Sequence, residues 1–458
     1  MPAPGWGSAS PTTSDRDRPA MSDGVKTLVA AELGAARRRS LAILDPLDDD
    51  DLSRQHSRLM SPLVWDLAHV ANYEELWLLR AAAAHPGVRR DVDHLYDAFR
   101  HPRANRPALP LLPPGEARAY AARVRDEVLA VLDRTELDPS VALLDRAFVY
   151  GMVIQHEHQH DETMLATRQL MGEAAAPLDV LLPPATGAPA GTLPAEVAVD
   201  GGTYVLGTDL EPWAYDNERP AHEVTVGPFR IDTTPVTNER YAEFLAAGGY
   251  DDPRWWTPDG WVWRMEAGLE HPEFWRREGD GAWSVLRFGR RLDLPPTEPV
   301  QHVCWYEADA CARWMGKRLP TEVEWEVAAT TGPGGAKRWW PWGEAAATPA
   351  HANLGQRHDG PSPVGAYPEG ASGWGCHQMM GDVWEWTSSD FAAYPGFAPF
   401  PYREYSEVFF GSDHKVLRGG SWATAPSAVR GTFRNWDLPV RRQIFSGFRC
   451  ARDDGRRS

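Results

Sequence analysis

The chain has 458 residues, enough for two or three domains, and a formal net charge of −17 at pH 7. This acidic balance argues against nucleic acids and anionic membrane surfaces as partners. No apolar run approaches the roughly eighteen residues of a membrane span, and residues 1–24 lack the apolar core of a signal peptide. The four cysteines form no closely spaced pair, so we expect reduced thiols in a cytoplasmic protein.

The first third of the chain is predicted to be helical. After a Pro-, Ser- and Arg-rich tail at residues 1–24, helices are expected at residues 25–44, 61–84, 115–132 and 140–172. Ser61 and Pro62 are predicted to be the N-cap and first residue of the second helix. On it Trp65, His69 and Tyr73 recur at helical spacing, which places His69 on the apolar face.

The sequence His156-Glu-His-Gln-His160 marks the last of these helices as a candidate metal site. His156 and His160 are four residues apart and share one face with Val149, Met152, Val153, Met164 and Thr167. Inward histidines on two helices of a four-helix bundle are typical of a metal site in the core. The motif also fits the HExxH pattern of zinc peptidases, with Glu157 as the general base. A metzincin would continue with Gly at 163 and His at 166, where this chain has Thr163 and Ala166.

The rest of the chain differs from the first third in composition and in predicted secondary structure. Residues 174–195 are rich in Pro, Gly and Ala and are interpreted as a linker. Eighteen of the 21 tryptophans follow, among short predicted strands broken by Gly, Pro, Asn and Asp. Helices are expected at residues 237–246, capped by Thr237, at residues 305–315, and from Thr321 onward. The pattern indicates a loop-rich α+β domain at residues 196–452, with a tail at residues 453–458.

Motifs in both halves resemble known families. Gly201-Gly-Thr-Tyr-Val-Leu-Gly207, Arg318-Leu-Pro-Thr-Glu-Val-Glu-Trp325, Gly381-Asp-Val-Trp-Glu-Trp386 and Arg418-Gly-Gly-Ser-Trp422 resemble the formylglycine-generating, or sulfatase-modifying-factor, family, whose fold is C-type-lectin-like. Residues 61–69 and 156–163 resemble the DinB-like four-helix bundles, which implies that residues 25–173 form such a bundle. In this order the two halves resemble the iron-dependent sulfoxide synthases of ergothioneine biosynthesis, and the fold class expected is multi-domain α and α+β.

This resemblance implies an enzyme that uses Fe(II) and O2 to join γ-glutamylcysteine to hercynine as a sulfoxide. It implies iron ligation by His69, His156 and His160, and proton donation by Tyr402, with Tyr394 and Tyr405 as nearby alternatives. The residues it assigns to γ-glutamylcysteine are Arg103, Arg106, Asp437 and Arg441. Those assigned to hercynine are Gln159, Asn435 and Trp436. Glu157, Asp161 and Glu162 are then expected to lie behind the ligands, where some orient the ligand imidazoles, or at the surface. We expect a monomer with an active site between the domains.

Other functions remain open at this point. The same chemistry with free cysteine, or with histidine as in ovothiol synthesis, would need similar residues. A zinc peptidase would use the HExxH motif, and a formylglycine-generating enzyme would need a copper-binding pair of cysteines. A lectin-like binding module without catalysis would leave the three histidines unexplained.

Overall fold

The computed structural model describes residues 17–178, 185–187 and 191–455, which divide into two compact units between Ala176 and Pro177. Residues 1–16 of the expected tail, parts of the expected linker and residues 456–458 lie outside the described residues. Residues 17–24, also assigned to the tail, are helical, because the first helix begins at Asp17. A proline at position 19 is compatible with this start, since the first turn has no partner for its backbone N–H groups. No helix of the described part is long and apolar enough to cross a membrane.

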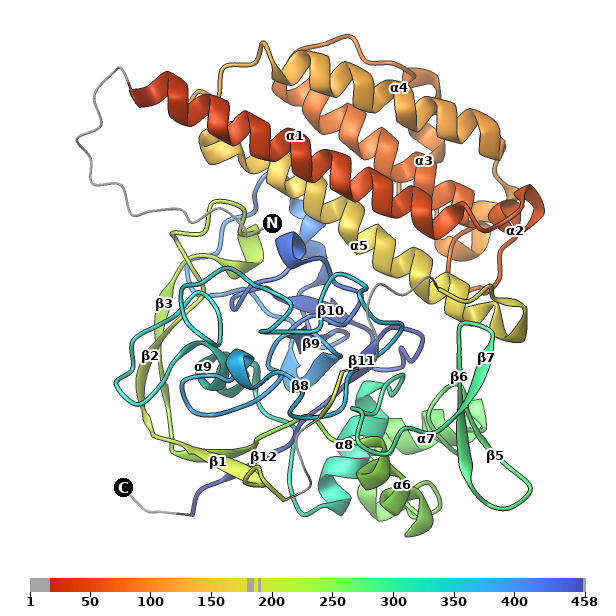
Figure 1. The fold of residues 1–458 in the computed structure, drawn as a ribbon, viewed down its shortest axis with the longest axis vertical. Coiled ribbons are helices and arrows are strands. Elements are labelled where there is room, and N and C mark those ends of the chain that lie inside the picture. Colours follow the sequence, from red (N-terminus) through yellow and green to blue (C-terminus); the bar gives the residue numbers. More distant parts are fainter. Residues whose placement is uncertain (1–16, 179–184, 188–190, 456–458) are drawn as a thin grey trace. The chain divides into compact units, whose positions relative to one another are not determined.

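The first unit is a helical bundle, as predicted (Figure 1). Helix α3 packs against α4 and α5, and α1 packs along α5. Short helical turns η1 to η5 join these elements, and η1 continues α3 as a π-helical segment. The α-helices are α1 (Asp17–Leu44), α2 (Asp49–Ser53), α3 (Leu63–Glu74), α4 (Pro114–Leu132) and α5 (Phe148–Leu170). The helical turns are η1 (Glu75–Ala82), η2 (Arg90–Leu95), η3 (Arg103–Ala108), η4 (Asp145–Ala147) and η5 (Gly172–Ala174).

Helix α3 is central to the bundle, and all of its residues are buried. It begins at Leu63, with Pro62 at the N-cap, so the prediction that Ser61 caps the helix is wrong. The Ser61 hydroxyl instead accepts a hydrogen bond of 2.5 Å from Nη1 of Arg106. A buried guanidinium needs acceptors, and this demand outweighs the ordinary capping preference of serine.

Helix α5 carries the histidine motif and is shorter than predicted. It begins at Phe148, not near residue 140, because Arg146 and Ala147 have left-handed backbone angles with φ of 48° and 57°. These two residues interrupt the helical hydrogen bonding and redirect the chain. Downstream of them α5 runs without a break to Leu170, so the histidine spacing is that of a regular helix.

The second unit is a loop-rich α+β domain, as predicted. Its sheets have the strand orders β1-β4-β12, β10-β9-β8-β11, β2-β3 and β5-β6-β7. The predicted cap of α6 is present, because the Thr237 hydroxyl accepts a hydrogen bond from the first turn of that helix. Thr321 caps α9 in the same way, at the predicted start of that helix. The helices are α6 (Asn238–Ala246), α7 (Pro258–Ala267), α8 (Trp305–Trp314) and α9 (Glu322–Thr330). The strands are β1 (Glu196–Val199), β2 (Gly202–Leu206), β3 (His222–Val226), β4 (Phe229–Asp232), β5 (Trp275–Arg277), β6 (Trp283–Arg287), β7 (Arg290–Asp293), β8 (Trp384–Asp390), β9 (Lys415–Arg418), β10 (Asn435–Asp437), β11 (Ser446–Gly447) and β12 (Ala451–Asp453).

Tryptophan accounts for much of the core of this unit. Trp325 on α9, Trp386 on β8 and Trp422 in the Gly-Gly-Ser-Trp motif are fully buried. Each indole N–H also has a partner: Glu385, the Val303 carbonyl and Gln301, respectively. Large rings whose polar atom is satisfied fill space between short strands that cannot form an extensive sheet core.

Candidate metal centre

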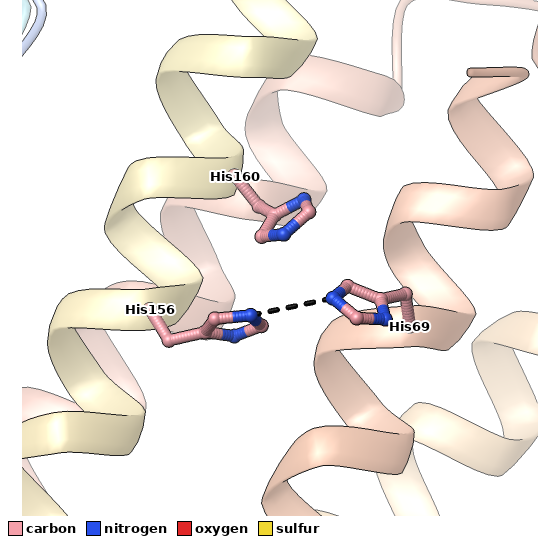
Figure 2. Close-up of side chains that lie close together, drawn as sticks. All are labelled: His69, His156 and His160. Atoms are coloured by element: carbon pink, nitrogen blue, oxygen red, sulfur yellow. Dashed lines mark hydrogen bonds between the residues drawn. The ribbon is translucent and has the colours of Figure 1, made fainter. Parts of the chain in front are cut away.

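Three histidines of the helical unit converge on one point (Figure 2). His69 comes from α3, and His156 and His160 come from consecutive turns of α5. One nitrogen of each ring lies within 4.8 Å of the others, and the Nε2 atoms of His69 and His156 are 3.3 Å apart. Figure 2 shows the three rings facing one another in the space between the two helices. The structure therefore brings together the three ligands predicted from the sequence.

Partners behind two of the rings fix which nitrogen faces the centre. Nδ1 of His69 lies 2.7 Å from the backbone carbonyl of Tyr96, and Nδ1 of His160 lies 3.0 Å from Oδ1 of Asp66. Because both partners are acceptors, each Nδ1 carries a proton and donates it, which leaves Nε2 as the ligand atom. His156 is held differently, since its ring stacks on Tyr73 with centroids 3.7 Å apart.

His69 and His156 are kept in the neutral form that binds metals. Burial, together with neighbouring histidines, lowers the pKa of His69 and of His156 well below its ordinary value. A neutral imidazole has a lone pair to donate, whereas imidazolium does not. The group contains no carboxylate, and an all-imidazole set suits zinc, copper, iron or nickel better than magnesium or calcium. The residues present thus fit a transition-metal ion.

Glu157, the general base of the zinc-peptidase interpretation, belongs to a buried ion-pair cluster. Its Oε1 accepts from Nε of Arg37 at 2.6 Å and from Ser40 at 3.0 Å, and its Oε2 accepts from Nη2 of Arg125 at 2.9 Å. Glu74 of α3 binds the same two arginines. The carboxylate is therefore engaged with α1 and α4, and the structure contradicts a role for Glu157 as base at the metal.

Asp161 and the middle histidine, His158, also lie outside the metal centre. Nδ1 of His158 is 3.0 Å from Oδ2 of Asp161, and the other oxygen of Asp161 accepts from Ser40 at 2.7 Å. Glu157 and Asp161, two of the three acids expected behind the ligands, therefore do not orient the imidazoles of the metal group. Asp66 and the Tyr96 carbonyl do so instead. The sequence contained one sign of this, because Asp66 is three residues before His69 and shares its helix face.

The two arginines predicted to bind a thiol substrate occupy η3. Arg106 is 5% exposed, donates to Ser61 and to the carbonyls of Ala98 and His101, and stacks 3.5 Å above Trp65. Trp65 stacks in turn on His69, with centroids 4.5 Å apart. Burial lowers the pKa of Arg106 to about 10. Arg103 is less buried and donates to the Leu59 carbonyl at 3.0 Å.

The predicted residues of the second unit form an aromatic and charged cluster around β10. Trp436 stacks on Phe391 at 4.1 Å and contacts the edge of Tyr405 at 6.0 Å, and Tyr402 lies 6.1 Å from Tyr405. Next to Trp436, the Oδ1 atom of Asn435 accepts from the Trp436 backbone N–H. The structure thus brings Tyr402 into the same aromatic group as Trp436. The alternative Tyr394 is buried, and Arg434 lies over its ring.

Two predicted charges adjoin this cluster. Nε of Arg441 lies 3.3 Å from Oδ1 of Asp437. Gln159, the remaining predicted substrate contact, is a half-buried residue of α5 beside His160 in the first unit.

The four cysteines are poorly suited to the copper-binding pair that a formylglycine-generating enzyme requires, because all of them are buried. All four cysteines, namely Cys304, Cys311, Cys376 and Cys450, are buried and free. Burial raises the pKa of each of these thiols, which disfavours the thiolate form that would bind a metal.

Comparison with known proteins supports the families predicted for the two halves of the chain and the order in which they follow each other. Residues 32–164 match the DinB superfamily, and residues 184–454 match the sulfatase-modifying factor enzyme 1-like domain. The hercynine oxygenase of Mycolicibacterium smegmatis is 52% identical over 434 residues, which cover 93% of this chain and 98% of the relative. The hercynine oxygenase of Mycolicibacterium thermoresistibile is 52% identical over 440 residues, which cover 94% of this chain and 96% of the relative. That of Mycobacterium tuberculosis is 50% identical over 430 residues, which cover 93% of this chain and 98% of the relative. The chain is an oxygenase that belongs to the hercynine oxygenase family.

Proposed function

We propose that this chain uses Fe(II) and O2 to join the sulfur of γ-glutamylcysteine to C2 of the hercynine imidazole, giving a sulfoxide. One O2 is consumed: the thiol S–H and the imidazole C2–H bonds break, a C–S bond and an S=O bond form, and the second oxygen leaves as water. A group of three imidazoles without a carboxylate carries this proposal, together with the relationship to the hercynine oxygenases. When bound there, iron would supply open coordination positions for O2 and thiolate.

In this proposal Arg103 and Arg106 bind carboxylates of γ-glutamylcysteine. Arg106 donates to neutral acceptors, and among the described residues no carboxylate forms an ion pair with it. A buried guanidinium without an anionic partner is suited to an anionic ligand, because its planar fork binds two carboxylate oxygens at once. The stack from Arg106 through Trp65 to His69 supports a location of the thiol substrate near the metal.

Asp437 and Arg441 of the second unit are assigned to the amino-acid end of the same substrate. Asp437 would accept from its ammonium group, and Arg441 would donate to its carboxylate. Arg441 is suited to this role because its buried Nη1 atom makes no hydrogen bond within the described part of the chain. The 3.3 Å contact between the two side chains keeps opposite charges side by side, as the ammonium and carboxylate of an amino acid require.

Hercynine carries a permanent trimethylammonium group, which cannot donate a hydrogen bond and is attracted to aromatic faces. We assign this group to Trp436 and Asn435, and we assign Gln159 as a further contact of hercynine. Trp436 is held by its stack on Phe391 and by the edge of Tyr405, so its orientation is fixed before substrate binds. Tyr402 is assigned as the general acid that delivers a proton from its phenol, and Tyr405, 6.1 Å from it, is the alternative donor.

Oxygen consumption by the full-length protein loaded with Fe(II) tests the proposed function. We expect O2 uptake only when γ-glutamylcysteine and hercynine are both present, with a sulfoxide product of the joined mass detected by mass spectrometry. Replacing γ-glutamylcysteine by cysteine tests the thiol, and replacing hercynine by histidine tests the ovothiol-type alternative. Absence of O2 uptake with the proposed pair would refute the function, and faster turnover with cysteine or histidine would reassign the substrate.

A further inference from the structure

Asp66 is a buried carboxylate that links the two helices of the metal centre. It is 1% exposed on α3, and its Oδ1 accepts from Nδ1 of His160 on α5 at 3.0 Å. His69 follows it by three residues on the same face of α3. Helix α3 therefore supplies one predicted ligand directly and the hydrogen-bond partner of a second one.

The three histidines are not equivalent because their partners differ in charge. His160 donates to a carboxylate, His69 donates to the neutral carbonyl of Tyr96, and His156 stacks on Tyr73. A carboxylate behind an imidazole fixes the ring and makes its other nitrogen a stronger ligand than a carbonyl does. We propose that Asp66 is a positioning residue that makes His160 the strongest of the three ligands and sets the affinity of the site for a divalent metal. This inference rests on the metal site of the proposed function and goes beyond it.

The surroundings of Asp66 indicate that its buried carboxylate is more stable when the histidines hold a metal ion. Its second oxygen, Oδ2, is buried and has no hydrogen-bond partner within the described part of the chain. Arg106 is close enough for its charge to interact with that of Asp66, but no ion pair joins them among the described residues. A buried carboxylate with an unsatisfied oxygen is costly by itself. A divalent cation on the far side of His160 offsets this cost, because the imidazole transmits the attraction between the two charges.

Asp66→Asn is expected to have different effects on the stability of the metal-free protein and on metal binding. Asp66→Asn keeps an oxygen that can accept from His160 but removes the buried negative charge. We expect the metal-free variant to unfold at a temperature no lower than that of the unsubstituted protein. We expect its Fe(II) affinity to fall by about 10- to 100-fold, the usual loss when such a partner of a ligand is changed. A merely structural role would instead lower the stability of the metal-free protein.

Asp161→Asn is a matched control, because Asp161 is also fully buried and directly follows His160. Its carboxylate contacts His158 and Ser40, neither of which belongs to the metal group. We expect this variant to lose stability and to keep the Fe(II) affinity of the unsubstituted protein.

Anaerobic titration of the full-length proteins with Fe(II), in competition with a chromogenic chelator, measures the affinities. Visible spectra of the Co(II)-loaded proteins report the ligand field, and we expect a shifted spectrum for Asp66→Asn alone. Affinities of Asp66→Asn and the unsubstituted protein within twofold of each other, or an equal loss in Asp161→Asn, would overturn the role of Asp66 while leaving the proposed function intact. Failure of the unsubstituted protein to bind Fe(II) would overturn both.

Discussion

Replacing Glu157 by Gln distinguishes a catalytic base from a structural anion. Burial by itself would raise the pKa of Glu157, but Arg37 and Arg125 outweigh it and lower the pKa to about 2. Relative to the ordinary value of about 4.5, this shift corresponds to about 3 kcal/mol of stability at neutral pH, present above the ordinary pKa and lost as the pH falls toward 2. Glu157→Gln removes the charge permanently and leaves two buried arginines with Glu74 as their remaining anion. We therefore expect the helical unit to lose about 3 kcal/mol.

Thermal unfolding of the metal-free full-length protein, followed by circular dichroism at a helix-sensitive wavelength, measures this loss. For a unit of this size we expect the midpoint to fall by about 6–12 °C. Asp126→Asn is the control, since Asp126 lies exposed beside Arg125 on α4, and we expect a change within about 0.5 kcal/mol. A Glu157→Gln variant with unaltered unfolding and abolished turnover would refute the structural reading and restore Glu157 as a base.

Three further substitutions test assigned residues, and a fourth tests a buried histidine of the second unit. His156→Ala is expected to weaken Fe(II) binding by more than about tenfold in the chelator competition, and retained affinity would exclude His156 as a ligand. Arg106→Lys keeps the charge but loses the planar fork, so the KM for γ-glutamylcysteine should rise about tenfold with kcat nearly constant, and an unchanged KM would contradict its role. Tyr402→Phe should keep substrate binding but divert the thiol to simple oxidation, and an unchanged yield of the C–S product would remove Tyr402 from the mechanism. Burial lowers the pKa of His302 to about 3, so the second unit should lose stability by up to about 1.4 kcal/mol per pH unit as the pH falls below about 6.5 toward 3. His302→Asn suits the φ of 64° and should flatten that dependence in urea titrations at several pH values, whereas an unchanged slope would show that His302 does not cause it.

Helical periodicity predicted where the three histidines of the candidate metal site lie, because each of them satisfies a local rule. The spacing of His156 and His160 placed them on one face, and the apolar pattern around His69 placed it inside the bundle. The sequence alone could not show that α3 and α5 are neighbours, because helix pairing is set by packing between residues far apart in the chain. The resemblance to DinB-like bundles supplied that information. The predicted roles of Arg103 and Arg106 also came from the resemblance, since exposed loop arginines are common.

The residues behind the ligands were harder to predict. Asp66 orients His160 across 94 positions of sequence, and the partners of Glu157 on α1 and α4 are 120 and 32 positions away. Contacts between residues so far apart in the chain cannot be predicted from local spacing. The wrong N-cap at Ser61 has the same origin, because the hydroxyl is used by Arg106 rather than by its own helix. The buried guanidinium of Arg106 needs a hydrogen-bond acceptor, and this requirement overrides the capping preference of serine, which contributes about 1 kcal/mol.

The HExxH pattern has a different meaning in this bundle because each residue of α5 faces a different neighbour. His156 and His160 face α3, and their rings meet His69. Glu157 is rotated by about 100° around the helix and faces the arginines of α1 and α4. The acid therefore stabilises the packing of α5 while the metal-facing side remains free of carboxylate. In a zinc peptidase the glutamate of this motif must reach the metal-bound water. In this bundle, the same position of the side chain would break the ion pairs of Glu157 with Arg37 and Arg125. The packing partner of each helix face, rather than the motif, decides whether the glutamate acts as a base or as a structural anion.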